Sequence, residues 1–153
     1  MENVIEKQIQ FRYSNIVVLF KNVNQMPDSF AGADFKTLSY NFNIKIEVAV
    51  KPELNTVIFN VNVSINEQNK SDILANFSIA NLFEIVNFND FIKLNNNGLY
   101  DIPPGLDSLL KPICLSTARG IIYTNLLGTY LQNTIMPVVF MNTFETLPPK
   151  VNI

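Results

Sequence analysis

The chain has 153 residues, of which 48% are hydrophobic and 16% charged, with a net charge of −2 and no histidine. This length and composition suit a single domain with a substantial core, and the weak acidic balance without a basic cluster argues against nucleic acid or an anionic membrane as a partner. The absence of histidine excludes Ser-His and Cys-His nucleophiles and removes the commonest zinc ligand.

The N-terminal part predicts one strand followed by a long connection. Residues 15–23, "NIVVLFKNV", are rich in β-branched and aromatic residues and are typical of a strand. The connection over 24–38 is too long for a tight hairpin. It carries Met26, Phe30 and Phe35, which are unusual in a solvated loop.

Three strands are predicted next, over 38–52, 56–66 and 72–86, and the first two of them alternate cleanly between apolar and polar residues. The turns between them, "PELN" and "EQNK", are short and therefore imply antiparallel hairpins. Four strands are expected in all, with a long crossover after the first. The predicted apolar faces of the last three strands are Tyr40, Phe42, Ile44, Ile46, Val48 and Val50; then Val57, Phe59, Val61, Val63 and Ile65; then Ala75, Phe77 and Ile79.

A long helix is predicted over 106–127, after a short helical or irregular stretch over 87–105. Pro112 removes one hydrogen bond and should kink this helix or mark its true start. The helix carries two apolar stripes on roughly opposite sides. The first is Leu106, Leu109, Leu110, Ile113, Thr117 and Ile121, and the second is Leu115, Ala118, Ile122 and Leu126.

A helix that is apolar on two sides has to be covered on two sides. One cover is its own sheet, and in a chain of this length we expect the other to be a second subunit. The alternative is that residues 87–105 fold over the helix. The predicted oligomer interface is accordingly the second stripe, Leu115, Ala118, Ile122 and Leu126.

The C-terminal part predicts a break and a short helix. Gly128 is expected to end the long helix, a loop runs to Pro137, and 138–147 is predicted as a short second helix. Residues 120–144 carry no charge, but polar and helix-breaking residues interrupt this run, so we expect no membrane insertion. The interrupting residues are Asn125, Gly128, Gln132, Asn133 and Pro137.

The sequence contains no pattern that is typical of an enzyme or of a cofactor site. The acidic residues are scattered singly, and neither a glycine-rich phosphate loop nor a CxxC pair is present. Cys114 is the single cysteine and is expected to be a small core residue rather than a nucleophile. The start, "MENVIEKQIQ", has no apolar signal core, and together with the cysteine count this favours a cytoplasmic protein.

The C-terminal part of the chain carries a short motif. It reads Ala118-Arg119-Gly120-Ile121-Ile122, Gly128-Thr129, Ile135-Met136-Pro137-Val138-Val139-Phe140 and Phe144. This motif and the order of elements resemble the SecB family of export chaperones, whose chains carry A-R-x-I-I, a glycine-containing break, then L-x-P-V-x-F and an aromatic residue. The stretch "FRYSNIVVLFKNV" is similar to the first strand of the family. The resemblance covers about 11–147 of a single domain over 1–153.

The resemblance implies an α+β fold with a four-stranded antiparallel sheet, a long helix and a short C-terminal helix. It also implies a homotetramer, a dimer of dimers with the long helices between the sheets. Members of this family bind unfolded polypeptides in apolar grooves, and some protect an antitoxin in toxin–antitoxin systems. By resemblance, the client-binding residues are Met26, Phe30, Phe35, Tyr40, Phe42, Phe140, Met141 and Phe144; the alternative for each is an ordinary core position.

The leading hypothesis is a holdase that binds non-native polypeptide without ATP, for export or for a dedicated client such as an antitoxin. Export-type members present carboxylates to the motor SecA, whereas the first strand here carries Lys21 and no acidic residue, so a role outside standard export is also open. A second hypothesis is an oligomeric α+β module that binds a small ligand or one protein partner without chaperone activity. A third is an enzyme that uses an isolated carboxylate.

Overall fold

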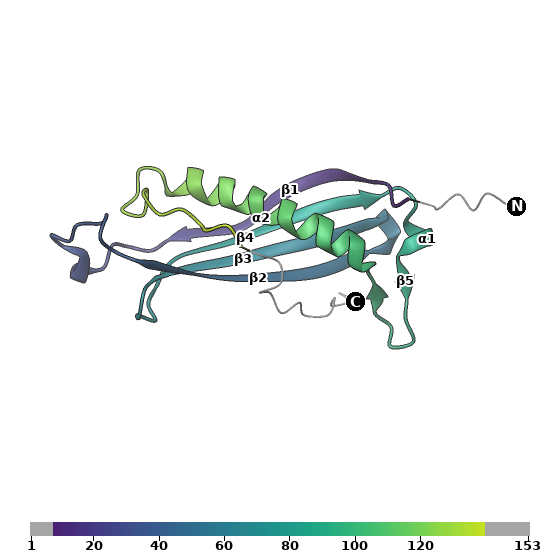
Figure 1. The fold of residues 1–153 in the computed structure, drawn as a ribbon, viewed down its shortest axis with the longest axis horizontal. Coiled ribbons are helices and arrows are strands. Elements are labelled where there is room, and N and C mark those ends of the chain that lie inside the picture. The colour runs from purple at the N-terminus through teal and green to yellow at the C-terminus, as the bar shows by residue number, and fades with distance from the viewer. Residues whose placement is uncertain (1–7, 140–153) are drawn as a thin grey trace, which may run out of the picture.

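The computed structural model describes residues 8–139, which form an antiparallel sheet with one long helix lying across one face (Figure 1). The sheet has the strand order β1-β4-β3-β2, so that β1 and β2 are its two edges. The crossover between them, residues 24–39, passes around one end of the sheet (Figure 1). The predicted α+β class and four-stranded antiparallel sheet are thereby confirmed. The strands are β1 (Phe11–Val23), β2 (Tyr40–Lys51), β3 (Thr56–Glu67) and β4 (Ile73–Ile85), with short 3-10 turns η1 (Asp28–Phe30) and η2 (Pro52–Leu54).

The strict alternation of the sequence sets the two faces of the sheet. Successive side chains of a strand point to opposite faces of the sheet. Every second residue of β3 and β4 therefore points toward the helix, which buries it. Residues of β2, β3 and β4 lie in rows across the sheet, as in the row Ile46, Val61 and Ile79, and the register shifts only near the end of β3, between Ile65 and Asn66. The fully buried members are Val57, Phe59, Val61, Ile65, Ala75, Ile79, Phe83 and Ile85, which include most of the predicted apolar face.

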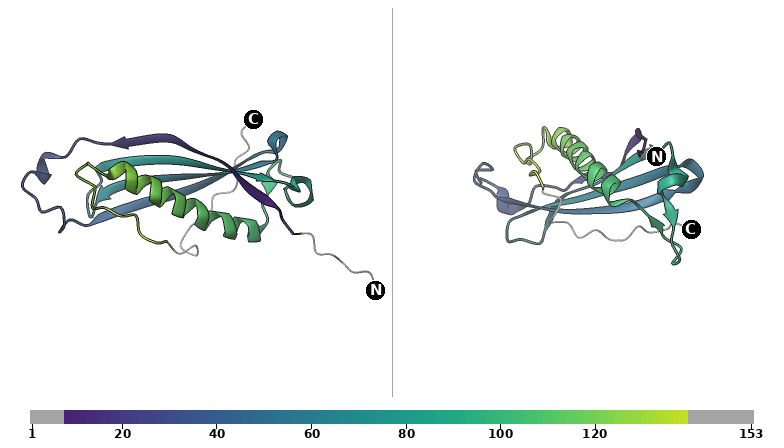
Figure 2. Two further views of the ribbon diagram at one scale, coloured as in Figure 1. Left: turned by 90° about the horizontal axis from the view of Figure 1, so that it is seen from above. Right: turned by 45° about the vertical axis from the view of Figure 1, so that its right-hand side comes forward.

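Helix α2 (Pro104–Leu126) contains Pro112 in its interior and ends just before Gly128, whose φ of +78° suits glycine. The helix crosses the twisted sheet obliquely (Figure 2). A step of four residues turns about 40° around a helix axis, so an oblique helix buries a row that winds around it. The residues of this row are Leu106, Leu110, Cys114, Ala118, Ile122 and Leu126.

The predicted oligomer interface is wrong, because its four residues lie in the core of a single chain. Leu115, Ala118, Ile122 and Leu126 are at most 3% exposed, which leaves them no surface to offer a second subunit. The buried row begins with Leu106 and Leu110 of the first predicted stripe and ends with Ala118, Ile122 and Leu126 of the second. Of the remaining residues of the first stripe, Ile113 and Ile121 are half-buried against the core, whereas Leu109 is 51% exposed.

The segment between β4 and α2 forms a small unit at the end of the sheet where α2 begins (Figure 1). Helix α1 (Phe88–Phe91) is followed by a hairpin of β5 (Lys93–Leu94) and β6 (Tyr100–Asp101). The buried side chains of Phe88 and Ile92 join the core there. The alternative for residues 87–105 was that they fold over the long helix. The unit lies at one end of α2 and does not cover its length (Figure 1).

The chain after α2 runs through turns to an irregular stretch. Val138 and Val139 lie in no helix, so the predicted second helix does not begin there, and the rest of its range, 140–147, lies outside the described residues. None of the helices within residues 8–139 combines the length and the apolar character that crossing a membrane would require.

Candidate functional site

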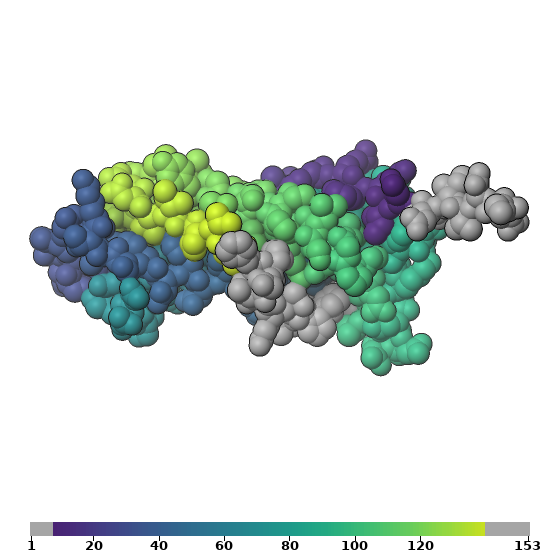
Figure 3. Space-filling model, viewed as in Figure 1, coloured from purple at the N-terminus to yellow at the C-terminus, as the bar shows by residue number. Residues whose placement is uncertain are grey.

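The main candidate site is a pocket of about 360 Å³ where the crossover meets the start of β2 and the loop after α2. We call it the crossover pocket. It brings together three of the predicted client-binding residues from two separate elements. Its lining residues are Phe35, Lys36, Leu38, Tyr40, Phe42, Asn133, Thr134 and Ile135. Figure 3 shows the crossover and the loop after α2 side by side at one end of the molecule.

Three aromatic rings form a cluster beside the pocket. The ring centroids of Phe30, Phe35 and Tyr130 lie 6.0 to 6.5 Å apart, within the range of favourable ring pairs. The Lys70 ammonium lies 5.8 Å from the centroid of Phe30, which adds a cation–π contact. The cluster explains why aromatic residues occur in a long connection: they attach it to the core.

Phe30 is only 2% exposed, so in this conformation it supports the pocket from behind and presents no surface to a client. Its predicted contact with a client therefore requires the crossover to move. Met26, by contrast, is 44% exposed but does not line the pocket. The predicted residues Phe140, Met141 and Phe144 lie outside the described residues.

Both ends of the crossover are fixed by backbone hydrogen bonds, one to the first residues of β4 and one to the turn between β3 and β4. The amide of Asn24 donates to the carbonyl of Leu74 at 2.8 Å, and the amide of Gln68 donates to the carbonyl of Ser39 at 2.8 Å. Between these points the crossover is held through its aromatic cluster. A pocket wall with fixed ends and a packed centre is a preorganised surface, which lowers the ordering cost of binding.

Tyr40 presents a buried hydroxyl beside the pocket, and this hydroxyl has no hydrogen-bond partner among residues 8–139. Burial, and then the nearby Glu67 carboxylate, raise the pKa of Tyr40, while Thr134 offsets part of the rise without reaching hydrogen-bonding geometry. Burial likewise raises the pKa of Tyr130. Both side chains are therefore neutral at physiological pH. An unpaired buried hydroxyl costs about 1–3 kcal/mol, which a polar group of a bound ligand can recover.

The opposite wall of the pocket is the loop after α2, which Arg119 attaches to the helix. The Arg119 guanidinium donates to the carbonyl of Met136 at 3.0 Å and to that of Pro137 at 3.1 Å. Leu131 and Met136 are buried, so the loop is anchored on both sides of the pocket residues 133–135. The two segments of the sequence motif, around Arg119 and around Pro137, are thus in direct contact.

Sequence reasoning missed the wall residues Lys36, Leu38, Asn133, Thr134 and Ile135. Ile135 is 62% exposed, and its place beside Met136 and Pro137 in the motif was a signal that could have identified it. Leu38 begins the predicted alternating stretch 38–52, just before β2, and could have been included for that reason. No signal in the sequence singles out the polar wall residues.

The pocket offers apolar, amide and hydroxyl contacts and one ammonium group, that of Lys36. In the part of the chain that the structure describes, no cluster of carboxylates and cysteine could hold a metal ion. Cys114 is fully buried, and burial raises the pKa of its thiol to about 12, so it carries almost no thiolate at neutral pH. The pocket can therefore make both apolar contacts and hydrogen bonds with a bound group.

A second uncovered apolar surface lies along β1 and the outer side of α2, and we call it the β1–α2 surface. The two elements are joined by a bond from the Lys21 ammonium to the Asn125 side-chain oxygen at 3.0 Å. Exposed apolar residues that gather on neighbouring elements can form a contact surface for another protein. Its large apolar residues, each 38–52% exposed, are Tyr13, Ile16, Val18, Leu109, Tyr123 and Leu127.

No protein-family model matches the sequence, and no curated protein matches it. Among solved structures, the chain is similar to Mycobacterium tuberculosis Rv1957, described as a SecB-like chaperone in complex with a ChAD peptide from the Rv1956 HigA1 antitoxin. The TM-score is 0.55 and the sequence identity 14%, over 85% of this chain and 88% of that chain. At this identity the likeness concerns the fold, which is SecB-like.

Proposed function

We propose that this protein is a SecB-like holdase that binds non-native polypeptide in apolar grooves without ATP. The observation that carries the proposal is the crossover pocket, in which Phe35, Tyr40 and Phe42 meet the loop that carries Ile135. The fold supports it, since a structure of the same fold has been solved with an antitoxin peptide bound. The client residues Met26, Phe30, Phe140, Met141 and Phe144 belong to the same proposal.

The free edge of β2 adds to the binding capacity of the pocket. Within residues 8–139, β2 pairs only with β3, so its outer backbone groups can pair with an added extended segment. Side chains of that segment would enter the pocket, where burial of apolar area contributes about 25 cal/mol per Å² before ordering costs. Such binding depends on an extended backbone and on apolar side chains, and not on one particular sequence.

A dedicated client, such as an antitoxin, is the more favoured role within this proposal. Docking to SecA would require an acidic surface on the sheet. The acidic residues on the uncovered face are Glu47 and Glu84, and each is paired with a cation, Lys45 at 2.7 Å and Arg12 at 2.7 Å respectively. Export through SecA is therefore less favoured. The protein would act as a single domain over 1–153 in the cytoplasm.

The proposed assembly is a homotetramer, a dimer of dimers. The buried second stripe of α2 cannot form its interface, so we assign this role to the β1–α2 surface. Its residues are apolar and exposed, and the cation between its two elements, Lys21, is bonded to the Asn125 side-chain oxygen. An apolar surface with few charges is typical of a permanent contact between subunits.

The experiment that tests the function is suppression of aggregation. A chemically denatured model protein is diluted into buffer with a stoichiometric amount of this protein, and light scattering is followed. Suppression is expected from the wild type. Ile135→Asp is expected to weaken it, because a charge at the pocket must be desolvated by an apolar client.

The matched control is Leu94→Asp, since Leu94 is 60% exposed and Ile135 62% exposed, but Leu94 lies in the distant hairpin. The control should suppress aggregation like the wild type. A wild type that fails to suppress aggregation at any ratio would overturn the holdase proposal. The alternative of a binding module for a small ligand or one protein partner would then be preferred.

A further inference from the structure

The face of the sheet opposite α2 is uncovered, and we call it the open face. It carries two adjoining grooves, of about 400 Å³ and about 380 Å³. Both cross all four strands, since each is lined by residues of β1, β2, β3 and β4. They are separate from the crossover pocket, with which they share no lining residue.

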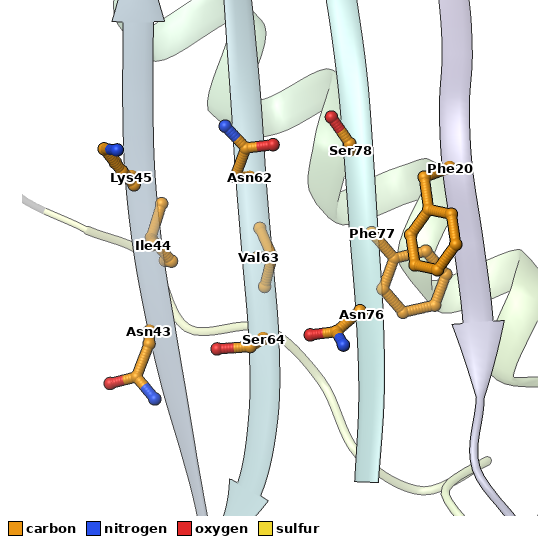
Figure 4. Close-up of a pocket in the computed structure, with 10 residues that line it drawn as sticks. All are labelled: Phe20, Asn43, Ile44, Lys45, Asn62, Val63, Ser64, Asn76, Phe77 and Ser78. Atoms are coloured by element: carbon orange, nitrogen blue, oxygen red, sulfur yellow. The ribbon is translucent and has the colours of Figure 1, made fainter. Parts of the chain in front are cut away.

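The first groove is lined by uncharged polar side chains and one lysine, together with apolar residues that include Phe20. Figure 4 shows its side chains in rows across β2, β3 and β4, with Phe20 of β1 at the end. The carboxamide of Asn76 makes no hydrogen bond within residues 8–139, and that of Asn43 uses only its donor, to Asn66 at 2.9 Å. The polar members are Asn43, Lys45, Asn62, Ser64, Asn76 and Ser78.

The second groove is apolar. It continues the first along the strands, and Asn60 and the Lys45-paired Glu47 lie at the junction. Leu19 is 58% exposed in it. Its apolar members are Val17, Leu19, Val48, Ala49, Ile58, Ala80 and Leu82.

A β-bulge at Leu19 places the side chain of Phe20 on the open face. In the pairing of β1 with β4, Val18 lies opposite Ile79, and Phe20 lies opposite Ser78, so Leu19 is the extra residue. Ile79 faces α2, whereas Ser78 faces away from it. Strict alternation would put Val18 and Phe20 on the same face, but the bulge sends Phe20, 52% exposed, to the open face.

We propose that the open face is a second polypeptide-binding surface, which holds an extended segment of the same client that occupies the crossover pocket. This inference rests on the proposed holdase function. A carboxamide contains the same donor and acceptor as a peptide group, so Asn43, Asn62 and Asn76 can pair with a client backbone whatever its sequence. Phe20 and Leu19 supply the apolar anchors beside them.

Two features make a client polypeptide the occupant. The ion pair of Lys45 with Glu47 leaves the face close to neutral, so neither acidic nor basic clients are repelled. The face is also continuous with the crossover pocket around the edge of β2. Phe42 lines the pocket and its neighbour Asn43 lines the polar groove, so a chain that leaves the pocket needs to pass only one edge strand to reach the open face.

The test is photo-crosslinking to a permanently unfolded protein, reduced and carboxymethylated α-lactalbumin. A photoreactive residue is placed at position 76 for the open face, at position 135 for the crossover pocket and at position 96, in the distant hairpin, as control. Crosslinks to the client from positions 76 and 135, and not from 96, are expected. A crosslink from position 135 alone overturns this inference and leaves the proposed function intact, whereas no client crosslink from either overturns both.

A variant measures the contribution of the anchors. Phe20→Asn with Leu19→Asn is expected to weaken client binding by about tenfold, and the control Leu94→Asn should leave it unchanged. Both replaced side chains are more than half exposed, so folding should be retained, which thermal unfolding checks. Unchanged client affinity, or self-crosslinking from position 76 with a smaller assembly in the double variant, shows that the face does not bind client and overturns the inference.

Discussion

Arg119, in the middle of α2, is bonded to Met136, which lies beyond the end of that helix: its Nε donates to the Met136 carbonyl at 3.0 Å. A second bond, from Nη2 to the Pro137 carbonyl at 3.1 Å, fixes the same loop. Hydrogen bonds from a charged donor are worth about 1.5–3 kcal/mol each. This one side chain therefore sets the position of the loop that walls the crossover pocket.

Arg119→Gln should lower client affinity and reduce the free energy of unfolding by about 1–3 kcal/mol, because two carbonyls lose a charged donor. The measurements are urea unfolding and the aggregation assay. Arg12→Gln is the control, since its ion pair with Glu84 is largely exposed and should contribute little. Equal effects of the two variants would show that the loop does not depend on Arg119.

The buried row of α2 gives a prediction that separates core from interface. Ile122→Ala should cost about 2–5 kcal/mol of stability, because Ile122 is 1% exposed within one chain, and should leave the assembly state unchanged. Leu109→Asp should do the reverse, since Leu109 is 51% exposed on the β1–α2 surface. Urea unfolding and sedimentation measure the two effects. Dissociation by Ile122→Ala without a loss of stability would contradict the assignment.

The strands could be predicted from the sequence because their alternation has a single interpretation. In β2 and β3 every second residue is apolar, and in β4 the same alternation is interrupted on the helix side by Asn81. Only one register puts these residues under a helix. Their boundaries agree with the prediction to within a few residues. The long crossover and the end of α2 before Gly128 followed from loop length and glycine geometry, which are also local properties.

The packed face of α2 could not be predicted, because its position depends on the angle at which the helix crosses the sheet. Two apolar stripes at about 100° per residue are compatible with several angles, and the oblique crossing selected a row that runs from Leu106 to Leu126. The face of Phe20 could not be predicted either. A bulge leaves no residue pattern in "NIVVLFKNV", since Val18, Leu19 and Phe20 are all apolar.

The crossover pocket was predicted in part. Phe35, Tyr40 and Phe42 were assigned to it by resemblance, and the structure brings them together, but whether they bind a client is a prediction that stays open to the experiments above. The polar wall from the loop after α2 was not foreseen, because its approach depends on Arg119 and on distant packing. Loop positions of this kind are set by tertiary contacts and not by local sequence.

Asn81 of β4 and Tyr13 of β1 form a hydrogen-bonded polar pair, which gives a further prediction. The Asn81 side chain is 0% exposed; its amide nitrogen donates to the carbonyls of Phe59 at 3.1 Å and Ile79 at 3.3 Å, and its oxygen accepts from the Tyr13 hydroxyl. Asn81→Ala should cost about 1–3 kcal/mol through the groups left unpaired. Tyr13→Phe should cost less, and a double-mutant cycle should give a coupling of about 0.5 kcal/mol or more. Additive effects in urea unfolding would show that the two side chains do not interact.

The buried thiol of Cys114 should make the free energy of unfolding decrease as pH rises above about 9. Burial raises the pKa of this thiol from 9.0 to about 12, so the folded state keeps the proton over a range in which the unfolded state loses it. The stabilisation is fully present below pH 9 and is lost as pH rises from about 9 to about 12, since the unfolded chain binds fewer protons there.

One pKa unit corresponds to about 1.4 kcal/mol. Between pH 8 and pH 10 the wild type should therefore lose about 1.4 kcal/mol more than Cys114→Ala, in which the tyrosines titrate equally. Urea unfolding at the two pH values measures this difference, and an equal loss in both proteins would contradict the burial of the thiol.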